Sequence, residues 1–147
     1  MEIKKYATLE DILNTDNDNL TKLDTGEYEV DKLGVIPFTA IDHAEHKQIK
    51  KDCMKMVPNG TGGMVPELDD DKLMLEVIVT AVDKDPRSNF TFANKGLLDK
   101  LGVTTANAAV GLLLKPGEIF NMAIEIQNLS GFGEKAKKEV KDAVKNS

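Results

Sequence analysis

Two histidines and the single cysteine are the side chains best suited to metal binding or nucleophilic chemistry in this sequence. His43 and His46 lie three residues apart, and Cys53 follows seven residues later. Imidazole and thiolate groups are ligands that Zn²⁺ prefers. On a helix, however, Cys53 would lie about 10 Å beyond His46, and no second cysteine or clustered acid completes four ligands. We therefore predict an exposed His43, a small buried Cys53 and no metal site.

Acidic and glycine-rich segments also fall short of known ligand-binding motifs. The acids Asp16, Asp18 and Asp24 resemble the start of a calcium loop. Such a loop needs a glycine at its sixth position, where Thr21 stands. The glycine-rich segment 60–63 lacks the lysine and hydroxyl residue that follow a phosphate-binding loop. We interpret both segments as solvated loops.

Catalytic pairs are equally scarce. Asp83 and Asp85 are two residues apart, but in a loop around a proline such acids usually stabilise turns. The histidines belong to no Ser–His–Asp or Cys–His arrangement. The sequence therefore predicts a protein that is not an enzyme and that carries no cofactor.

The composition describes an acidic chain. Of its 147 residues, 25 are Asp or Glu and 19 are Lys or Arg, which gives a net charge of −6 and a pI near 5.0. Nucleic-acid partners need a basic face, so the charge argues against them. No apolar run approaches the ~20 residues of a membrane span, and the first residues lack the features of a secretory signal. We therefore expect an intracellular protein that contacts no membrane.

The elements that position these residues are mostly helices. Capping residues and apolar spacing predict a short helix at 8–13 and about five helices in one domain, at 43–57, 72–82, 93–101, 106–114 and 116–130. The Val and Ile content of residues 73–82 also suits a buried strand, and periodicity alone does not distinguish a strand from a helix here. We favour a helix because the segment begins with acids and is long.

Period-two alternation predicts one small β hairpin near 27–41, and loops are expected at 14–25 and 58–63. The fold class is thus mainly α with a small β hairpin (α+β), as a single compact domain over 1–147. Residues 1–25 form an acidic arm, and 133–147 form a basic, flexible tail.

The last two predicted helices allow an alternative interpretation. Residues 104–130 have the form of a helical hairpin with a Pro-Gly turn, like a helix-turn-helix. A DNA-reading second helix needs basic or amide side chains on its outer face. This one offers two acids, three amides and no base, namely Glu118, Asn121, Glu125, Gln127 and Asn128. A small acidic regulatory protein or DNA mimic built on this hairpin is the alternative function, and a packed structural hairpin is favoured.

One sequence block resembles a known family. Residues 111–120 read GLLLKPGEIF, and they are followed by Glu125-Ile126 and by LSGFG at 129–133. This block resembles the C-terminal signature of the XkdN-like tail assembly chaperones of phages and prophages of Gram-positive bacteria. The segment 8–13 and the strand pair ending at 37–41 resemble the same family in the same order, so the resemblance covers nearly the whole chain.

This resemblance implies a non-enzymatic role in the host cytoplasm. Such a chaperone binds the long, apolar, helical tape-measure protein and keeps it soluble until tail-tube subunits polymerise around it. The chaperone is then absent from the mature virion. A longer form made by frameshifting would recruit tail-tube protein, and self-association is left open.

A chaperone for an aggregation-prone helix needs exposed apolar side chains. The apolar stripe of helix 116–130 is one source of them, but most of this stripe should be core. We expect its ends to be exposed and to bind the client. These candidate partner-binding residues are Leu113, Leu114, Phe120 and Phe132.

Overall fold

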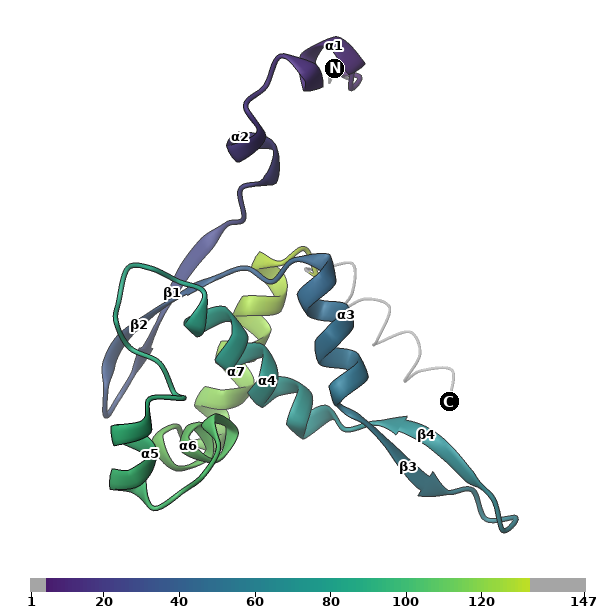
Figure 1. Ribbon diagram of the computed structural model, residues 1–147, viewed down its shortest axis with the longest axis vertical. Helices are drawn as coiled ribbons and strands as arrows, with labels where there is room; N and C mark the ends of the chain where they lie inside the picture. Colours follow the sequence, from purple (N-terminus) through teal and green to yellow (C-terminus); the bar gives the residue numbers. More distant parts are fainter. Residues whose placement is uncertain (1–4, 133–147) are drawn as a thin grey trace.

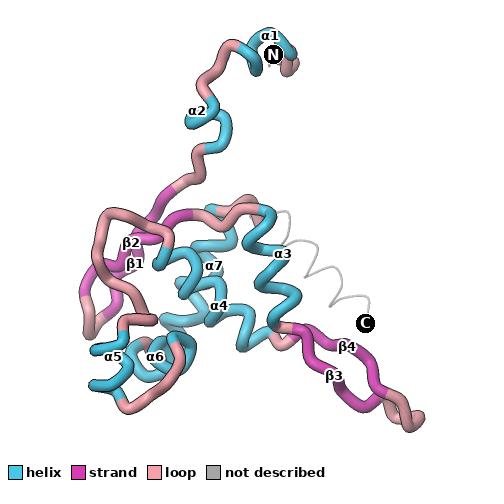
Figure 2. The backbone as a smooth tube through the Cα atoms, in the orientation of Figure 1, coloured by secondary structure: helices cyan, strands magenta, loops and turns pink. Residues whose placement is uncertain are grey.

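The computed structural model describes residues 5–132 of the chain. Within them, a mainly helical body carries an N-terminal arm at one end and a β hairpin at the other (Figure 1). Figure 2 shows how helices dominate this body, and the predicted α+β class is confirmed. The elements of this part are α1 (Leu9–Leu13), α2 (Asn17–Thr21), β1 (Thr25–Val30), β2 (Gly34–Thr39), α3 (His43–Asp52), β3 (Met54–Pro58), β4 (Met64–Leu68), α4 (Asp70–Asp83), α5 (Lys95–Leu101), α6 (Ala106–Leu113) and α7 (Pro116–Leu129).

Helix α4 is the centre of the body, where it packs against α3, α6, α7 and β2. Asp69 caps its first turn by accepting a hydrogen bond from the backbone N–H of Lys72. The acids of the first turn complement the helix dipole, and the helix favoured for 73–82 is confirmed. Its almost fully buried residues are Val77, Ile78, Ala81 and Val82.

Local signals begin and end the helices around α4. Gly102 closes α5 with a φ of 72°, in the left-handed region that favours glycine. The hydroxyl of Thr105 caps α6 by accepting from the N–H of Ala108, and Pro116 occupies the first turn of α7. The three helices predicted in this half of the chain are thereby confirmed.

The first hairpin, β1–β2, packs on α4 and α7 and is the hairpin predicted from the sequence. Its pairs Tyr28–Ile36 and Gly26–Phe38 share one face, which points into the core. A Cβ atom on Gly26 would lie 2.8 Å from the Phe38 ring, closer than such atoms approach. The strand therefore passes so close to this ring that only glycine fits.

The helix predicted over 43–57 is shorter than expected. It ends at Asp52, because Cys53 leaves the helical path and the next residues pair with β4 as an antiparallel strand. The apolar residues 54, 56 and 58 have the period of a strand, and Pro58 disfavours helix in the residue before it. The missed element is this second hairpin.

The loop predicted at 58–63 is an ordered turn. The side-chain oxygen of Asn59 accepts hydrogen bonds from the N–H and hydroxyl of Thr61 and from the N–H of Gly63. Gly60 and Gly62 have positive φ values of 82° and 89°, which glycine adopts without strain. The turn thus fixes the register of β3 against β4.

The N-terminal arm leaves the body at β1 and points away from it (Figure 1). The Thr8 hydroxyl caps α1 by accepting from the N–H of Asp11, which confirms the predicted first helix. The single turn α2 lies in 14–25, where the sequence predicts a loop; its acidic first turn suits a short helix. The predicted tail at 133–147 lies outside the described residues.

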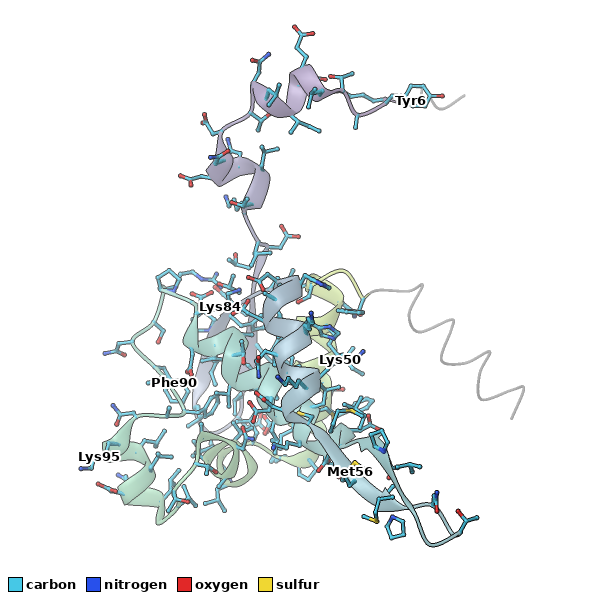
Figure 3. The ribbon with its side chains drawn as sticks, turned by 45° about the vertical axis from the view of Figure 1, so that its right-hand side comes forward. Tyr6, Lys50, Met56, Lys84, Phe90 and Lys95 are labelled. Carbon is cyan, nitrogen blue, oxygen red and sulfur yellow. The ribbon has the colours of Figure 1, made fainter. Side chains whose placement is uncertain are left out.

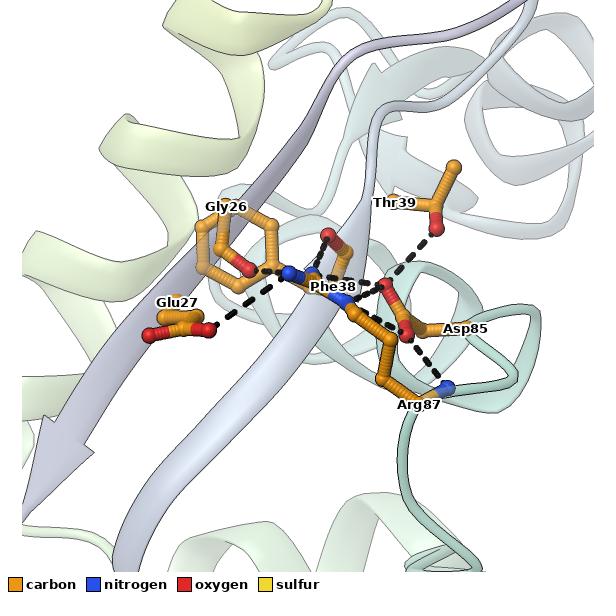
Figure 4. A network of polar contacts seen from close by, with 6 residues as sticks. All are labelled: Gly26, Glu27, Phe38, Thr39, Asp85 and Arg87. Carbon is orange, nitrogen blue, oxygen red and sulfur yellow. Dashed lines mark hydrogen bonds and ion pairs between the residues drawn. The ribbon is translucent and has the colours of Figure 1, made fainter.

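A polar network fastens the segment after α4 to the root of the arm (Figure 4). Asp85 is 5% exposed, and Arg87 donates to its carboxylate from the backbone N–H (2.9 Å), from Nε (3.0 Å) and from Nη2 (2.9 Å). The Thr39 hydroxyl donates to the same carboxylate at 2.9 Å. Nη2 also donates to the carbonyl oxygens of Gly26 (2.7 Å) and Phe38 (3.1 Å). Arg87 thus ties both strands of the first hairpin to one buried charge.

This network accounts for the two acids near Pro86. Arg87 lowers the pKa of Asp85 to about 2, although burial acts in the opposite direction. Asp83 is exposed and accepts a hydrogen bond from the Thr91 hydroxyl at 2.6 Å. Both carboxylates therefore hold the local fold, and neither faces the other as a catalytic pair would.

We predict that Gly26→Ala destabilises the protein by about 1–3 kcal/mol, because the added methyl group displaces the buried Phe38 ring. The matched control is Gly111→Ala inside α6, where nothing lies within 4 Å of the new Cβ. That change should be neutral or stabilise by up to about 1 kcal/mol. Urea unfolding measures both, and equal free energies of unfolding for the two variants would contradict the predicted close contact.

We predict that Asp85→Asn lowers the free energy of unfolding at neutral pH by about 2 kcal/mol, because Arg87 loses its buried charged partner. The folded-state pKa of Asp85, about 2, lies below the ordinary 3.8. Its stabilisation is therefore complete above pH 4 and lost as the pH falls through 2. Between pH 2 and 6, the free energy of unfolding should therefore depend less on pH in the variant than in the wild-type protein.

The control is Asp31→Asn, which removes an exposed ion pair with Lys115. Exposed pairs contribute little, so this variant should change stability less than Asp85→Asn does. Equal losses of unfolding free energy in the two variants would show that the buried network stabilises the protein no more than the exposed ion pair does.

Candidate functional site

Of the four predicted partner-binding residues, three are at least partly exposed. Phe120 and Phe132 expose 53% and 41% of their surface, and Leu113 is half-buried. Leu114 exposes only 3%. It follows α6 in extended geometry, its N–H donates to the carbonyl of Val110, and its side chain joins the core. The expectation that Leu114 is exposed is therefore wrong.

The two phenylalanines lie at opposite ends of α7. Phe120 lies near its start and Phe132 follows its end, and the helix from residue 120 to residue 129 spans about 13 Å. The Phe132 ring contacts His46 of α3, with 4.7 Å between ring centroids. The middle of the α7 stripe is core, as predicted, with Met122, Ala123 and Ile126 buried.

A more coherent apolar surface lies on the second hairpin, which the sequence analysis missed. Directly opposed residues of an antiparallel pair share a face, so the pairing of β3 with β4 gathers six apolar residues on one side. On the other side, Lys55 opposes Glu67, and Val57 opposes Val65. We call the apolar side the Met face; it consists of Met54, Met56, Pro58, Met64, Pro66 and Leu68.

The Met face is open to a partner. Its three methionines expose between 45% and 58% of their surface, and Figure 3 shows Met56 on a hairpin that projects from the body. A two-stranded hairpin is marginal unless its apolar side is covered. Methionine is flexible and polarisable, so it adapts to apolar partners of irregular shape. The sequence signal was period-two alternation on both sides of an Asn-Gly pair.

Positive charge lies on α3, immediately before this hairpin. Lys47, Lys50 and Lys51 are exposed, and none of them forms an ion pair with another residue of the range 5–132. The hairpin base is tied to α4, because the Cys53 carbonyl accepts from the N–H of Asp69 at 2.8 Å. The apolar face therefore has a basic helix as its direct neighbour in the chain.

The N-terminal arm presents a second set of exposed apolar side chains. Leu9, Ile12 and Leu13 share one side of α1, because they are three and four residues apart. Leu9 and Leu13 expose 72% and 73% of their surface. Further along the arm, Tyr6 and Leu20 are exposed as well, and Figure 3 shows Tyr6 at its far end. None of these residues belongs to the core of the described range or packs against it.

His43 and Cys53 occupy the places that the sequence indicates. Cys53 is buried, and burial is the main cause that raises its pKa. His43 is exposed, whereas His46 is half-buried, and burial followed by the charge of Lys50 lowers its pKa. Among residues 5–132, no three His, Cys, Asp or Glu side chains are grouped as a metal site requires.

A shallow pocket of about 390 Å³ lies between β2 and the segment after α4. Its lining includes Val35, Pro37 and Phe90 and contains no titratable side chain. Such a pocket can take a small apolar group. In the described part of the chain, no helix combines the length and apolarity needed to cross a membrane.

Helices α6 and α7 form the predicted helical hairpin. The exposed side of α7 includes Asn121, Glu125 and Asn128, and it carries no positive charge. A recognition helix in a DNA groove needs basic side chains that reach phosphates and base edges. The hairpin therefore gives no support to the regulator alternative.

Comparison with known proteins identifies the family of the chain. No curated protein is significantly similar to the chain. The fold is similar to the crystal structure of the protein yqbn, with a TM-score of 0.53 at 19% identity; the match covers 87% of this chain and 99% of that chain. A family model described as phage XkdN-like tail assembly chaperone protein matches residues 9–145. The chain therefore belongs to the XkdN-like family of phage tail assembly chaperones.

Proposed function

We propose that this chain binds the tape-measure protein of its phage in the bacterial cytoplasm and keeps it soluble until the tail tube forms around it. The observation that carries the proposal is the Met face, an uncharged apolar surface on a projecting hairpin. A tape-measure protein is a long helical client with many similar apolar stretches. A surface of flexible methionines suits such a client, because it can accept many side-chain patterns.

The size of the Met face fits a reversible contact. Its exposed side chains cover on the order of a few hundred Å², the range of functional apolar patches. A standard stable interface takes about 800 Å² from each partner. One copy would therefore hold the client weakly, and several copies along it would be displaced when tube subunits bind. The proposed absence from the mature virion follows from this weakness.

The charge distribution supports the same role. The net charge of −6 opposes association between covered clients, while the Met face itself is free of charge. An acidic body therefore supplies solubility, and the hairpin supplies contact with the client. A longer frameshifted form that recruits tail-tube protein fits this division of roles.

We predict that co-expression with the tape-measure protein of the same phage raises the soluble fraction of that protein several-fold. The double variant Met56→Gln/Met64→Gln should lose most of this effect, because glutamine keeps the side-chain length but removes the apolar contact. The soluble fraction is read from the client bands of cleared and total lysates.

The matched control is Leu33→Gln/Val35→Thr on the first hairpin, where Val35 has the same 58% exposure as Met56. This variant should retain the wild-type effect, and neither variant changes the net charge. An unchanged client solubility with the wild-type chain would overturn the proposed function. An equal loss of client solubility in both variants would instead show that the Met face has no specific part in client binding.

A further inference from the structure

The arm is the second unpartnered apolar element of this chain. Helix α1 has five residues, which is too short to be stable alone in water. Its apolar side, formed by Leu9, Ile12 and Leu13, is exposed and takes no part in the core of the described range. Near its capped end lie Glu10 and Asp11, so α1 is an acidic amphipathic helix without a surface to cover. Such a helix becomes stable when its apolar side is buried against a partner.

We propose that the arm of one copy covers the Met face of a second copy, and that the two copies exchange arms in a closed dimer. In one molecule the arm and the second hairpin lie at opposite ends of the longest axis (Figure 1). The arm, as it leaves β1, therefore points away from its own Met face. Two copies that lie side by side in opposite directions bring each arm to the hairpin of the other. Both contacts are then equivalent, and the symmetry closes the assembly at two copies.

Opposite charges on the arm and on α3 indicate where the arm lies on the second copy. The arm carries four acids in α1 and α2 and the loop between them, namely Glu10, Asp11, Asp16 and Asp18. On α3, Lys47, Lys50 and Lys51 are exposed and form no ion pair with a described residue. These opposite charges attract across the approaching copies, most strongly at low salt.

The acids around the hairpin refine this placement. Glu67 opposes Lys55 on the far side of the hairpin, and the Asp52 carboxylate accepts from Gln48. Asp69 to Asp71 stand at the base on the α4 side, where they repel an acidic arm. The arm therefore lies along the α3 side of the Met face.

The expected dimer is weak. Each arm buries three apolar side chains of α1 and part of one Met face, and the exchange makes this contact twice. The total falls at the lower end of the range for specific interfaces. A client helix can then displace the arm from the Met face; this last step rests on the proposed function, whereas the dimer does not.

Disulfide trapping between two variants tests the contact. Chains with Leu13→Cys and with Met56→Cys are mixed and oxidised gently, and the disulfide-linked products are identified by mass. We expect the mixed Leu13–Met56 product to dominate over both homodimers. The native thiol of Cys53 does not compete, because it is 1% exposed and its pKa is raised by burial.

The matched control replaces Met56→Cys by Val35→Cys, at a position of equal exposure on the other hairpin. Its mixed product with Leu13→Cys should be several-fold less abundant. Equal yields for the two positions would overturn the proposal.

Charge reversal tests the same contact without cysteine chemistry. Sedimentation of the wild-type chain should show a monomer–dimer equilibrium that shifts to monomer at high salt. Lys50→Glu/Lys51→Glu should shift it to monomer at low salt, and mixing with Glu10→Lys/Asp11→Lys should restore a dimer of one chain of each kind. A wild-type chain that stays monomeric at every concentration tested, or the lack of rescue, would overturn the proposal. If the dimer behaves as expected but the chain does not keep the tape-measure protein soluble, the proposed function is contradicted and the dimer is not.

Discussion

The burial of helix α4 is the constraint on which the rest of this structure depends. Four of its side chains are almost fully inaccessible, and Leu73, Met74, Leu75 and Val79 are partly buried against the same core. A helix that is apolar nearly all round must be surrounded. α3, α6, α7 and the first hairpin supply that cover, so the apolar residues of α4 are buried or partly buried. The exposed apolar side chains lie on other elements, and the arm and the second hairpin carry most of them.

The sequence predicted the parts of the fold that local chemistry determines. The side chains of Thr8, Asp69 and Thr105 form the caps that helix-start rules indicate, and Pro116 begins the last helix. The first hairpin was visible because it alternates polar and apolar residues on a half-buried sheet. In each case the signal lies within a few residues of the element, so no knowledge of distant partners was needed.

The errors arose where the outcome depends on distant contacts. Residues 49, 53 and 56 follow a helical period, yet the last of them belongs to a strand, because pairing with β4 outweighs the local pattern. Leu114 ends a helix at a point that suits exposure, but the chain turns its side chain into the core. The same limit applies to the other predicted partner-binding residues: an apolar stripe does not reveal which of its residues the rest of the fold covers. The Met face could be assigned only once the register of β3 and β4 was known.

The contact of Arg87 with the start of β1 links the packing of the body to the proposed roles of the arm. Arg87 donates to the Gly26 carbonyl, one residue into β1, while the buried Asp85 carboxylate holds its guanidinium. The strand from which the arm emerges is thus held by a charge pair that belongs to the segment after α4. A rigid root matters because a helix of five residues contributes little binding energy, and holding it in place lowers the entropy lost when it docks. The pair of Asp85 and Arg87 that holds both strands of the first hairpin therefore also holds the strand from which the arm emerges.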